Sequence, residues 1–271
     1  MPSDFSAAPG IARFDVLGLP VSAIDLTQAV QTIDTWIRER TPHYVCITGV
    51  HGVMESRRDE SLRRIHARAG MVTPDGMPLV WLGHVAGHGH VRRVYGPDLM
   101  LACLRRSLQT RTRHFFFGGG PGVAEQLAAR LSAQLPGLLV AGTYCPPFRP
   151  LTPEEDERVI EEIDGSDADV VWVGLSTPKQ ERWMADHVSR LRAPVLVGVG
   201  AAFDFHAGLK PQAPGWMQRN GLEWLFRLAT EPRRLWRRYL INNPAFIWHV
   251  TRAWMRGNLV RQVPPSVERS M

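Results

Sequence analysis

The chain has few cysteines, and they lie far apart. Its three cysteines, Cys46, Cys103 and Cys145, form no Cys-x-x-Cys pair within the 271 residues. This spacing argues against a disulfide framework and a cysteine-ligated zinc site, and it favours a reducing compartment. The N-terminus lacks the features of a secretory signal, and no apolar run is long enough to span a membrane. We therefore expect a cytoplasmic protein, which does not exclude one that lies on a membrane.

Common nucleotide and metal motifs are also missing. The segment Gly118-Gly119-Gly120-Pro121-Gly122 is not the dinucleotide fingerprint, because Val123 stands where a third spaced glycine is required. The chain has no Walker lysine, and we expect no Asp-x-Asp that holds a divalent ion. These absences weaken the prediction of a nucleotide-dependent oxidoreductase, which remains an alternative.

Charge is distributed unevenly along the chain. The formal net charge is +6, yet residues 210–271 hold 11 Lys+Arg against three Glu, while the remainder holds 21 positive and 23 negative residues. Five of the nine tryptophans also follow residue 210. A near-neutral body with a basic, Trp-rich tail predicts a core over residues 1–210 and an appendage over residues 211–271.

Short apolar runs alternate with helical patterns over the first two hundred residues. We expect strands at Phe14–Leu19, His43–Thr48, Ala69–Val72, His114–Phe117, Leu138–Gly142, Val170–Gly174 and Pro194–Val199. Continuous apolar strands separated by helices predict an α/β fold, Rossmann-like, with a mainly parallel sheet covered by helices on both faces. A basic helical appendage follows at the C-terminus, where we expect Asn243-Pro244 to break the helices.

The tetrapeptide Thr73-Pro74-Asp75-Gly76 places one acidic side chain directly after a strand-like run. A carboxylate at the C-terminal end of a parallel strand lies at the rim where open sheets bind substrates. Proline fixes φ ahead of Asp75, and glycine after it lets the backbone approach a ligand closely. Pro-Asp-Gly is also ordinary turn chemistry, so this segment alone leaves a turn and a catalytic carboxylate open.

Other loops and helix starts suggest ligand binding. Gly118–Gly120 would present backbone N–H groups to a phosphate, or form a tight strand–helix turn. Gln180 lies in a first helical turn, where its amide suits a sugar hydroxyl, a phosphate or a uracil edge. Arg93 suits bidentate binding of a diphosphate. Asp204 lies between two phenylalanines and is either an acceptor for a ligand hydroxyl or the partner of a nearby arginine.

Seven short motifs follow one another in a specific order. They are Thr-Pro-Asp-Gly (73–76), Arg-Val-Tyr-Gly-Pro-Asp-Leu (93–99), Phe-Phe-Gly-Gly-Gly-Pro-Gly (116–122), Pro-Lys-Gln-Glu (178–181), Gly-Ala-Ala-Phe-Asp-Phe (200–205), Gly-Leu-Glu-Trp (221–224) and Pro-Arg-Arg (232–234). As an ordered set over about residues 14–250, they closely resemble the WecG/TagA/CpsF glycosyltransferases (glycosyltransferase family 26).

The resemblance implies an inverting, membrane-associated transferase. Such an enzyme moves a sugar, of the ManNAc, ManNAcA or glucose type, from a UDP-sugar to a polyprenyl-diphosphate-linked glycan in cell-surface or exopolysaccharide synthesis. Asp75 matches the family's proposed catalytic base, and Arg93, Gln180 and Asp204 match residues implicated in donor or acceptor binding. The family usually has Thr-x-Asn after the second strand. Here a glycine stands where asparagine is expected, and the neighbouring Thr48 is the candidate for that role.

The expected chemistry needs no bound metal. One carboxylate deprotonates the acceptor hydroxyl as it attacks the anomeric carbon. Arginine, backbone amides and helix N-termini can stabilise the departing UDP in place of a divalent ion. We therefore predict metal-independent transfer with no cofactor.

The basic tail predicts a surface for an anionic membrane. Arg233, Arg234, Arg237 and Arg238 recur at helical spacing beside tryptophans, which suits peripheral binding at the inner face of the cell membrane. The alternatives are a solvated helix packed on the body and a nucleic-acid-binding surface. Nucleic-acid binding would leave the strand-end motifs unexplained, so we expect no nucleic-acid partner. The donor sugar, the acceptor and a homo-oligomeric state stay open.

Overall fold

The computed structural model of the protein describes residues 11–257 and 262–263. The chain divides into two compact units, each built from separate stretches of sequence. Of the described residues, 27–46 and 96–211 form the first unit, and 11–26, 47–95, 212–257 and 262–263 form the second. The expected division into a core over 1–210 and an appendage over 211–271 stays a prediction.

The main sheet has six strands in the order β4-β3-β8-β7-β5-β6. Their bounds are β3 His43–Thr48, β4 Met71–Pro74, β5 Arg113–Gly118, β6 Leu139–Tyr144, β7 Val170–Gly174 and β8 Val195–Gly198. The pairs β3–β8, β8–β7, β7–β5 and β5–β6 are all parallel. This arrangement confirms the predicted α/β, Rossmann-like class, because parallel neighbours need crossover helices between them.

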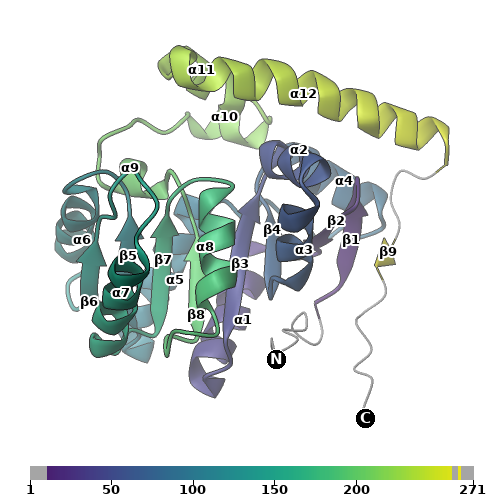
Figure 1. Ribbon diagram of the computed structural model, residues 1–271. Coiled ribbons are helices and arrows are strands. Elements are labelled where there is room, and N and C mark those ends of the chain that lie inside the picture. Colours follow the sequence, from purple (N-terminus) through teal and green to yellow (C-terminus); the bar gives the residue numbers. More distant parts are fainter. Residues whose placement is uncertain (1–10, 258–261, 264–271) are drawn as a thin grey trace, which may run out of the picture. The chain divides into compact units, whose positions relative to one another are not determined.

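The first unit contains α1 Leu26–Glu39 from Thr27 onward, and α5 Gly96–Thr110, α6 Val123–Gln134, α7 Pro153–Gly165, α8 Lys179–His187 and α9 Ala202–His206. Within this unit, α7 and α8 lie in front of the strands and α5 lies behind them (Figure 1). Side chains of β5 and β7 fill the space between these layers, since Trp172 and the three phenylalanines Phe115–Phe117 are buried. Strands buried on both faces read as continuous apolar runs, which is why the sequence identified β7 to the residue.

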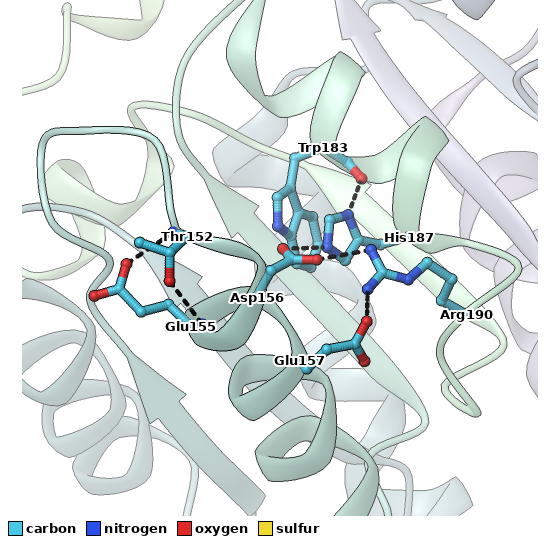
Figure 2. Close-up of polar contacts among 7 residues, drawn as sticks. All are labelled: Thr152, Glu155, Asp156, Glu157, Trp183, His187 and Arg190. Carbon is cyan, nitrogen blue, oxygen red and sulfur yellow. Dashed lines mark hydrogen bonds and ion pairs between the residues drawn. The ribbon is translucent and has the colours of Figure 1, made fainter.

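Polar contacts fasten α7 to α8 (Figure 2). Asp156 on α7 accepts hydrogen bonds from His187 Nε2 at 2.9 Å and from Arg190 at 2.7 Å. The other nitrogen of His187 lies 2.7 Å from the Trp183 carbonyl oxygen. Thr152 and Glu155 form a capping box at the start of α7. These contacts fix α8, whose first turn carries Gln180.

The second unit begins with a hairpin where we expected one strand. The predicted strand Phe14–Leu19 is divided into β1 Arg13–Val16 and β2 Leu19–Ser22. Leu17 and Gly18 form the two-residue turn, with φ of 55° and 92°. Two consecutive positive φ values match the two-residue turn whose twist suits a β-hairpin. Leucine is not typical of such a turn, so the sequence did not indicate it. A short strand, β9 Gln262–Val263, pairs with β1 to complete a small sheet.

Helices make up the rest of the second unit: α2 Val50–Arg58, α3 Glu60–Arg68, α4 Met77–Val85, α10 Gly215–Arg219, α11 Glu223–Thr230 and α12 Pro232–Met255. Asp59 separates α2 from α3, because its side chain accepts hydrogen bonds from the backbone N–H groups of Ser61 and Leu62 and so caps α3. Helix α12 packs on α2 (Figure 1).

The expected helix break at Asn243-Pro244 is wrong. Pro244 lies inside α12, which continues to Met255. Pro244 is exposed, and so is Leu240, whose carbonyl loses its helical N–H partner. Water can hydrate that carbonyl on the exposed side of the helix, so the proline does not end it.

Candidate active site

Asp75 lies directly after β4, as the sequence predicted. Its backbone N–H donates to the Thr48 carbonyl oxygen at 2.9 Å, which fixes the residue against the end of β3. Gly76 follows with φ of 131°, a conformation that favours glycine, and α4 begins at Met77. The Asp75 side chain is 29% exposed, so it is partly shielded from water and still accessible.

Arg93 is the main charged neighbour of Asp75. Its Nη2 lies 3.6 Å from Asp75 Oδ1 and makes a closer ion pair with Glu223. Its Nη1 donates to Gln218 Oε1 at 3.0 Å, and its guanidinium carbon lies 3.9 Å from the centre of the Tyr95 ring. Arg93 and Glu223 are mostly buried, at 14% and 15% exposure. The arginine therefore lies between two carboxylates but hydrogen-bonds to only one of them.

These surroundings shift the protonation of Asp75. Burial raises its pKa to about 6; Arg93 opposes this shift and Glu223 adds to it, while Arg227 and Arg238 lower the pKa. Burial is the largest cause because a carboxylate loses hydration in a less polar environment. A carboxylate with a pKa near neutrality suits general-base catalysis, since it is ionised at pH 7 and still binds a proton well.

Several hydrogen-bond donors around Asp75 are unsatisfied. Among the described residues, Nε of Arg93, Nε of Arg238 and the Tyr95 hydroxyl are buried without a hydrogen-bond partner. Burial also lowers the pKa of Arg238 and raises that of Tyr95. Buried donors of this kind normally have partners, so the cluster suits an anionic or hydroxyl-rich ligand.

The Thr48 carbonyl oxygen accepts a hydrogen bond from the Asp75 backbone, and the Thr48 hydroxyl hydrogen-bonds to His66. His66 Nδ1 lies 2.9 Å from the Leu62 carbonyl oxygen, which can only accept, so Nδ1 carries the proton. His66 Nε2 then accepts from the Thr48 hydroxyl at 3.1 Å. Thr48 is 2% exposed. Its assignment to substrate binding stays a prediction, and His66 is a supporting residue that the sequence did not reveal.

Steric crowding explains why position 49 is a glycine. A Cβ on Gly49 would lie 2.7 Å from the Asp75 carbonyl oxygen. No real Cβ approaches another atom so closely, so any larger residue there would displace the Asp75 backbone. The chain therefore departs from the family's Thr-x-Asn pattern at a point of close contact with the candidate base.

The glycine loop of the first unit contains two kinds of glycine. A Cβ on Gly118 would lie 2.7 Å from backbone atoms of Gly174, and one on Gly119 would lie 2.8 Å from Val123 Cβ. Both also have positive φ, of 132° and 78°. Gly120 has neither constraint, since its added Cβ would meet only Val123 Cγ2 at 3.8 Å. Packing explains the first two glycines, and only Gly120 lacks a structural reason.

Gln180 lies in the first turn of α8 and is 3% exposed. Its Nε2 donates to Glu181 Oε1 at 3.2 Å, which also accepts from Thr177 at 2.8 Å. The remaining side-chain oxygens of Gln180 and Glu181 are buried and lack hydrogen-bond partners among the described residues. These acceptors suit hydroxyl or N–H groups of a ligand.

Asp204 lies on α9 and pairs with Lys210 at 2.7 Å. The sequence left a ligand contact and a structural ion pair open, and the structure provides the ion pair, with lysine in place of the expected arginine. The Nε2 atom of the neighbouring His206 lies 3.0 Å from the Pro97 carbonyl oxygen.

The chain matches the model of the glycosyl transferase WecG/TagA/CpsF family over residues 14–259. It belongs to this family. The predicted resemblance and the predicted enzyme class, a glycosyltransferase, are therefore confirmed.

Two relatives share most of their length with this chain. One, from Bacillus spizizenii, is 28% identical over 227 residues, which are 82% of this chain and 86% of the relative. Another, from Staphylococcus aureus strain MRSA252, is 25% identical over 244 residues, which are 89% and 93% of the two chains. Both are named N-acetylglucosaminyldiphosphoundecaprenol N-acetyl-beta-D-mannosaminyltransferase.

The four arginines of α12 in this glycosyltransferase do not share one environment. Arg233, Arg234 and Arg237 are exposed, whereas Arg238 is half-buried with its Nε enclosed. Arg238 also acts electrostatically on Asp75. Arg238 therefore faces the interior of the second unit more than the other three, and the assignment of the four arginines to a membrane surface stays a prediction.

The structure brings the predicted site residues together in two groups. Thr48, Asp75, Arg93 and Arg238 belong to the second unit, and Gly118, Gly119, Gly120, Gln180 and Asp204 belong to the first. Sequence reasoning assigned no role to Gln218 or Glu223. Glu223 had a signal, because it lies in the Gly-Leu-Glu-Trp motif that carried the family resemblance.

Two further features are absent from the part of the chain that the structure describes. Within 11–257 and 262–263, no group of three or more His, Cys, Asp or Glu side chains is arranged to hold a metal ion. An Asp-x-Asp does occur at 167–169, ahead of β7, and there Asp169 pairs with Arg40 at 2.8 Å. No helix in the described part of the chain is long and apolar enough to cross a membrane.

Proposed function

We propose that this glycosyltransferase transfers an N-acetylmannosamine-type sugar from a UDP donor to a polyprenyl-diphosphate-linked glycan, with inversion. The observation that carries the proposal is the Asp75 cluster, in which a carboxylate with a pKa of about 6 lies beside arginines. The names of the relatives support the choice of sugar and acceptor.

In the proposed reaction, Asp75 is the general base. The acceptor hydroxyl gives its proton to the Asp75 carboxylate while its oxygen bonds to the anomeric carbon. The bond from that carbon to UDP breaks on the opposite side, and UDP leaves with the electron pair. Attack opposite to the leaving group inverts the configuration, and the β linkage in the relatives' names agrees with this outcome.

Donor binding is proposed for residues of the first unit. The free acceptor oxygens of Gln180 and Glu181 suit donor hydroxyl or N–H groups. Gly120 lies shortly before α6, and backbone N–H groups at a helix N-terminus favour phosphate. In the second unit, Arg93 and Arg238 add positive charge around Asp75, so stabilising negative charge there does not require a metal ion.

Helix α12 is proposed to bind an anionic membrane surface. Its buried residues Leu235, Asn242 and Phe246 follow at intervals of seven and four, which places them on one side of the helix. The opposite side is both basic and apolar. It exposes Arg233, Arg234, Trp236, Arg237, Leu240, Ile241, Ile247, Trp248, Trp254 and Met255. Exposed tryptophans beside arginines suit the interface of a peripheral protein at the inner face of the cell membrane.

A transfer assay tests the proposal. The full chain is incubated with GlcNAc-diphosphoundecaprenol in vesicles and with UDP-ManNAc, UDP-ManNAcA or UDP-glucose, and the anomeric configuration of the product is determined by NMR. We expect β-linked product from one UDP-hexose, undiminished by EDTA, with activity rising with pH through about 6 as Asp75 loses its proton. Strict dependence on manganese, or an α-linked product, would contradict the proposal.

A further inference from the structure

Arg93 is restrained by three groups of the second unit. Glu223 forms an ion pair with Nη2, Gln218 accepts from Nη1 at 3.0 Å, and Tyr95 stacks against the guanidinium. Glu223 and Gln218 come from the C-terminal stretch, far from Arg93 in sequence. A planar guanidinium held on two edges and one face has little freedom to turn.

Asp75 lies just outside this set of contacts. The 3.6 Å between Arg93 Nη2 and Asp75 Oδ1 is an ion-pair distance but too long for a hydrogen bond. An arginine without other partners would pair with the carboxylate through two parallel hydrogen bonds. Such a pair occupies both carboxylate oxygens and lowers the pKa of the acid by about 1–3 units, which makes a weaker base.

We propose that Glu223 is a positioning residue for the transfer reaction: it holds the Arg93 guanidinium off Asp75 and so keeps the Asp75 carboxylate available to the acceptor hydroxyl. This proposal rests on the proposed role of Asp75 as base. Glu223 itself touches no reacting atom, and acts only through Arg93.

The charges around Asp75 give the proposal a definite sign. Arg93, Glu223, Arg227 and Arg238 act on Asp75, and of these only Glu223 is negative. Neutralising Glu223 removes a charge that raises the pKa of Asp75 and releases Arg93 to pair with it. Both effects lower the pKa, so the acid limb of the pH–rate profile should move to lower pH.

The test compares pH profiles of kcat and kcat/KM in full-length variants. For Glu223→Gln we expect the acid limb to move to lower pH by about one unit or more. We also expect kcat at pH 7.5 to fall about tenfold, because Asp75 is then a weaker base and is paired with Arg93. Glu223→Asp retains the charge and should keep the limb closer to its original position. The control is Glu60→Gln, which removes an exposed carboxylate paired with Arg63 on α3 and should change neither quantity.

Three results would overturn the positioning role: an unchanged profile, a loss of rate with the acid limb in place, or a limb that moves to higher pH. If Glu223→Gln does not fold, Gln218→Met decides instead. It releases the other edge of Arg93 and should lower the Asp75 pKa by a smaller amount, read from the carboxyl ¹³C signal that Asp75→Asn removes. An unchanged Asp75 pKa in Gln218→Met would reject the proposal. Full activity of Asp75→Asn would instead reject Asp75 as base, which separates failure of the proposed function from failure of this inference.

Discussion

The two units of this glycosyltransferase use the ends of their strands in different ways. In the second unit, β4 ends at Pro74 and is followed directly by Asp75, which lies among charged side chains. In the first unit, β5 and β7 end in Gly118 and Gly174, which are packed too closely for a side chain on Gly118. One strand end therefore presents a titratable group, while the others present backbone.

This difference suggests that the two units have different chemical roles. A carboxylate near neutral pKa can accept a proton, whereas glycine backbone and the amide of Gln180 can recognise a ligand without changing charge. Proton transfer depends on the protonation state of one carboxylate, whereas ligand recognition depends on the shape that several residues form together. Substitutions in the two units should therefore fail in different ways: catalysis in the second, folding or donor affinity in the first.

Asp75→Asn should have the largest effect on turnover. We expect kcat to fall by about 10²–10⁴-fold, because the amide cannot take the proton. Stability should move the other way. The pKa of Asp75 is raised in the folded chain, so its ionised form destabilises the fold above about pH 6, and this penalty disappears as pH falls towards 4. Asp75→Asn should then gain about 1–2 kcal/mol at pH 7.5 and nothing near pH 4, measured by thermal denaturation.

The matched variant for this experiment is Asp204→Asn in the first unit. It removes a carboxylate that is paired with Lys210 and 25% exposed, which is similar to the exposure of Asp75. We expect a smaller loss of kcat than with Asp75→Asn. Equal losses would mean that proton transfer is not confined to the second unit, and the comparison of the two units would fail.

Gly118→Ala and Gly120→Ala should separate packing from recognition. Gly118 has φ of 132° and no room for a Cβ, so alanine there should destabilise the fold by about 2–4 kcal/mol. Gly120 has room, so alanine should change stability by less than about 1 kcal/mol and raise KM for the donor several-fold. Thermal denaturation and donor titration measure the two effects. An unchanged donor KM for Gly120→Ala would leave this loop with a structural role alone.

Gly49→Ala should produce an intermediate effect. The new Cβ would lie 2.7 Å from the Asp75 carbonyl oxygen, so the Asp75 backbone must shift. Overpacking of this kind destabilises by about 1–3 kcal/mol, and the displaced base should lower kcat about tenfold. Gly52→Ala is the control, since its Cβ would press on the Thr48 side chain and not on Asp75. If both variants have equal activity, the Gly49 contact does not position the base.

Sequence reasoning recovered the α/β class and the main strands because continuous apolar runs are a direct consequence of burial on both faces. His43–Thr48 and Val170–Gly174 were predicted to the residue. Sequence reasoning failed where a local signal was missing, or where the surrounding structure overrode that signal. Leu17 in a hairpin turn gives no turn signal, and the exposed side of α12 accommodates Pro244 inside the helix.

The candidate site was predictable only as single residues. Asp75 and Arg93 were found from motifs, but the ion pair between Arg93 and Glu223 joins positions 130 residues apart, and no spacing rule connects them. Packing also divided apparently equivalent residues. Gly118 and Gly120 look alike in sequence, as do Arg237 and Arg238, yet only the structure distinguishes their environments.

The smallest expected effects concern the two adjacent arginines of α12. Arg237 is exposed on the side proposed to bind membrane, and Arg237→Gln should weaken binding to anionic vesicles by about fivefold, or about 1 kcal/mol, in a flotation assay. It should not move the acid limb of the pH–rate profile. Arg238 lowers the pKa of Asp75, so Arg238→Gln should move that limb to higher pH and weaken vesicle binding less. Equal effects of both variants on flotation, with no change in the profile, would place Arg238 on the membrane side after all and remove it from the Asp75 cluster.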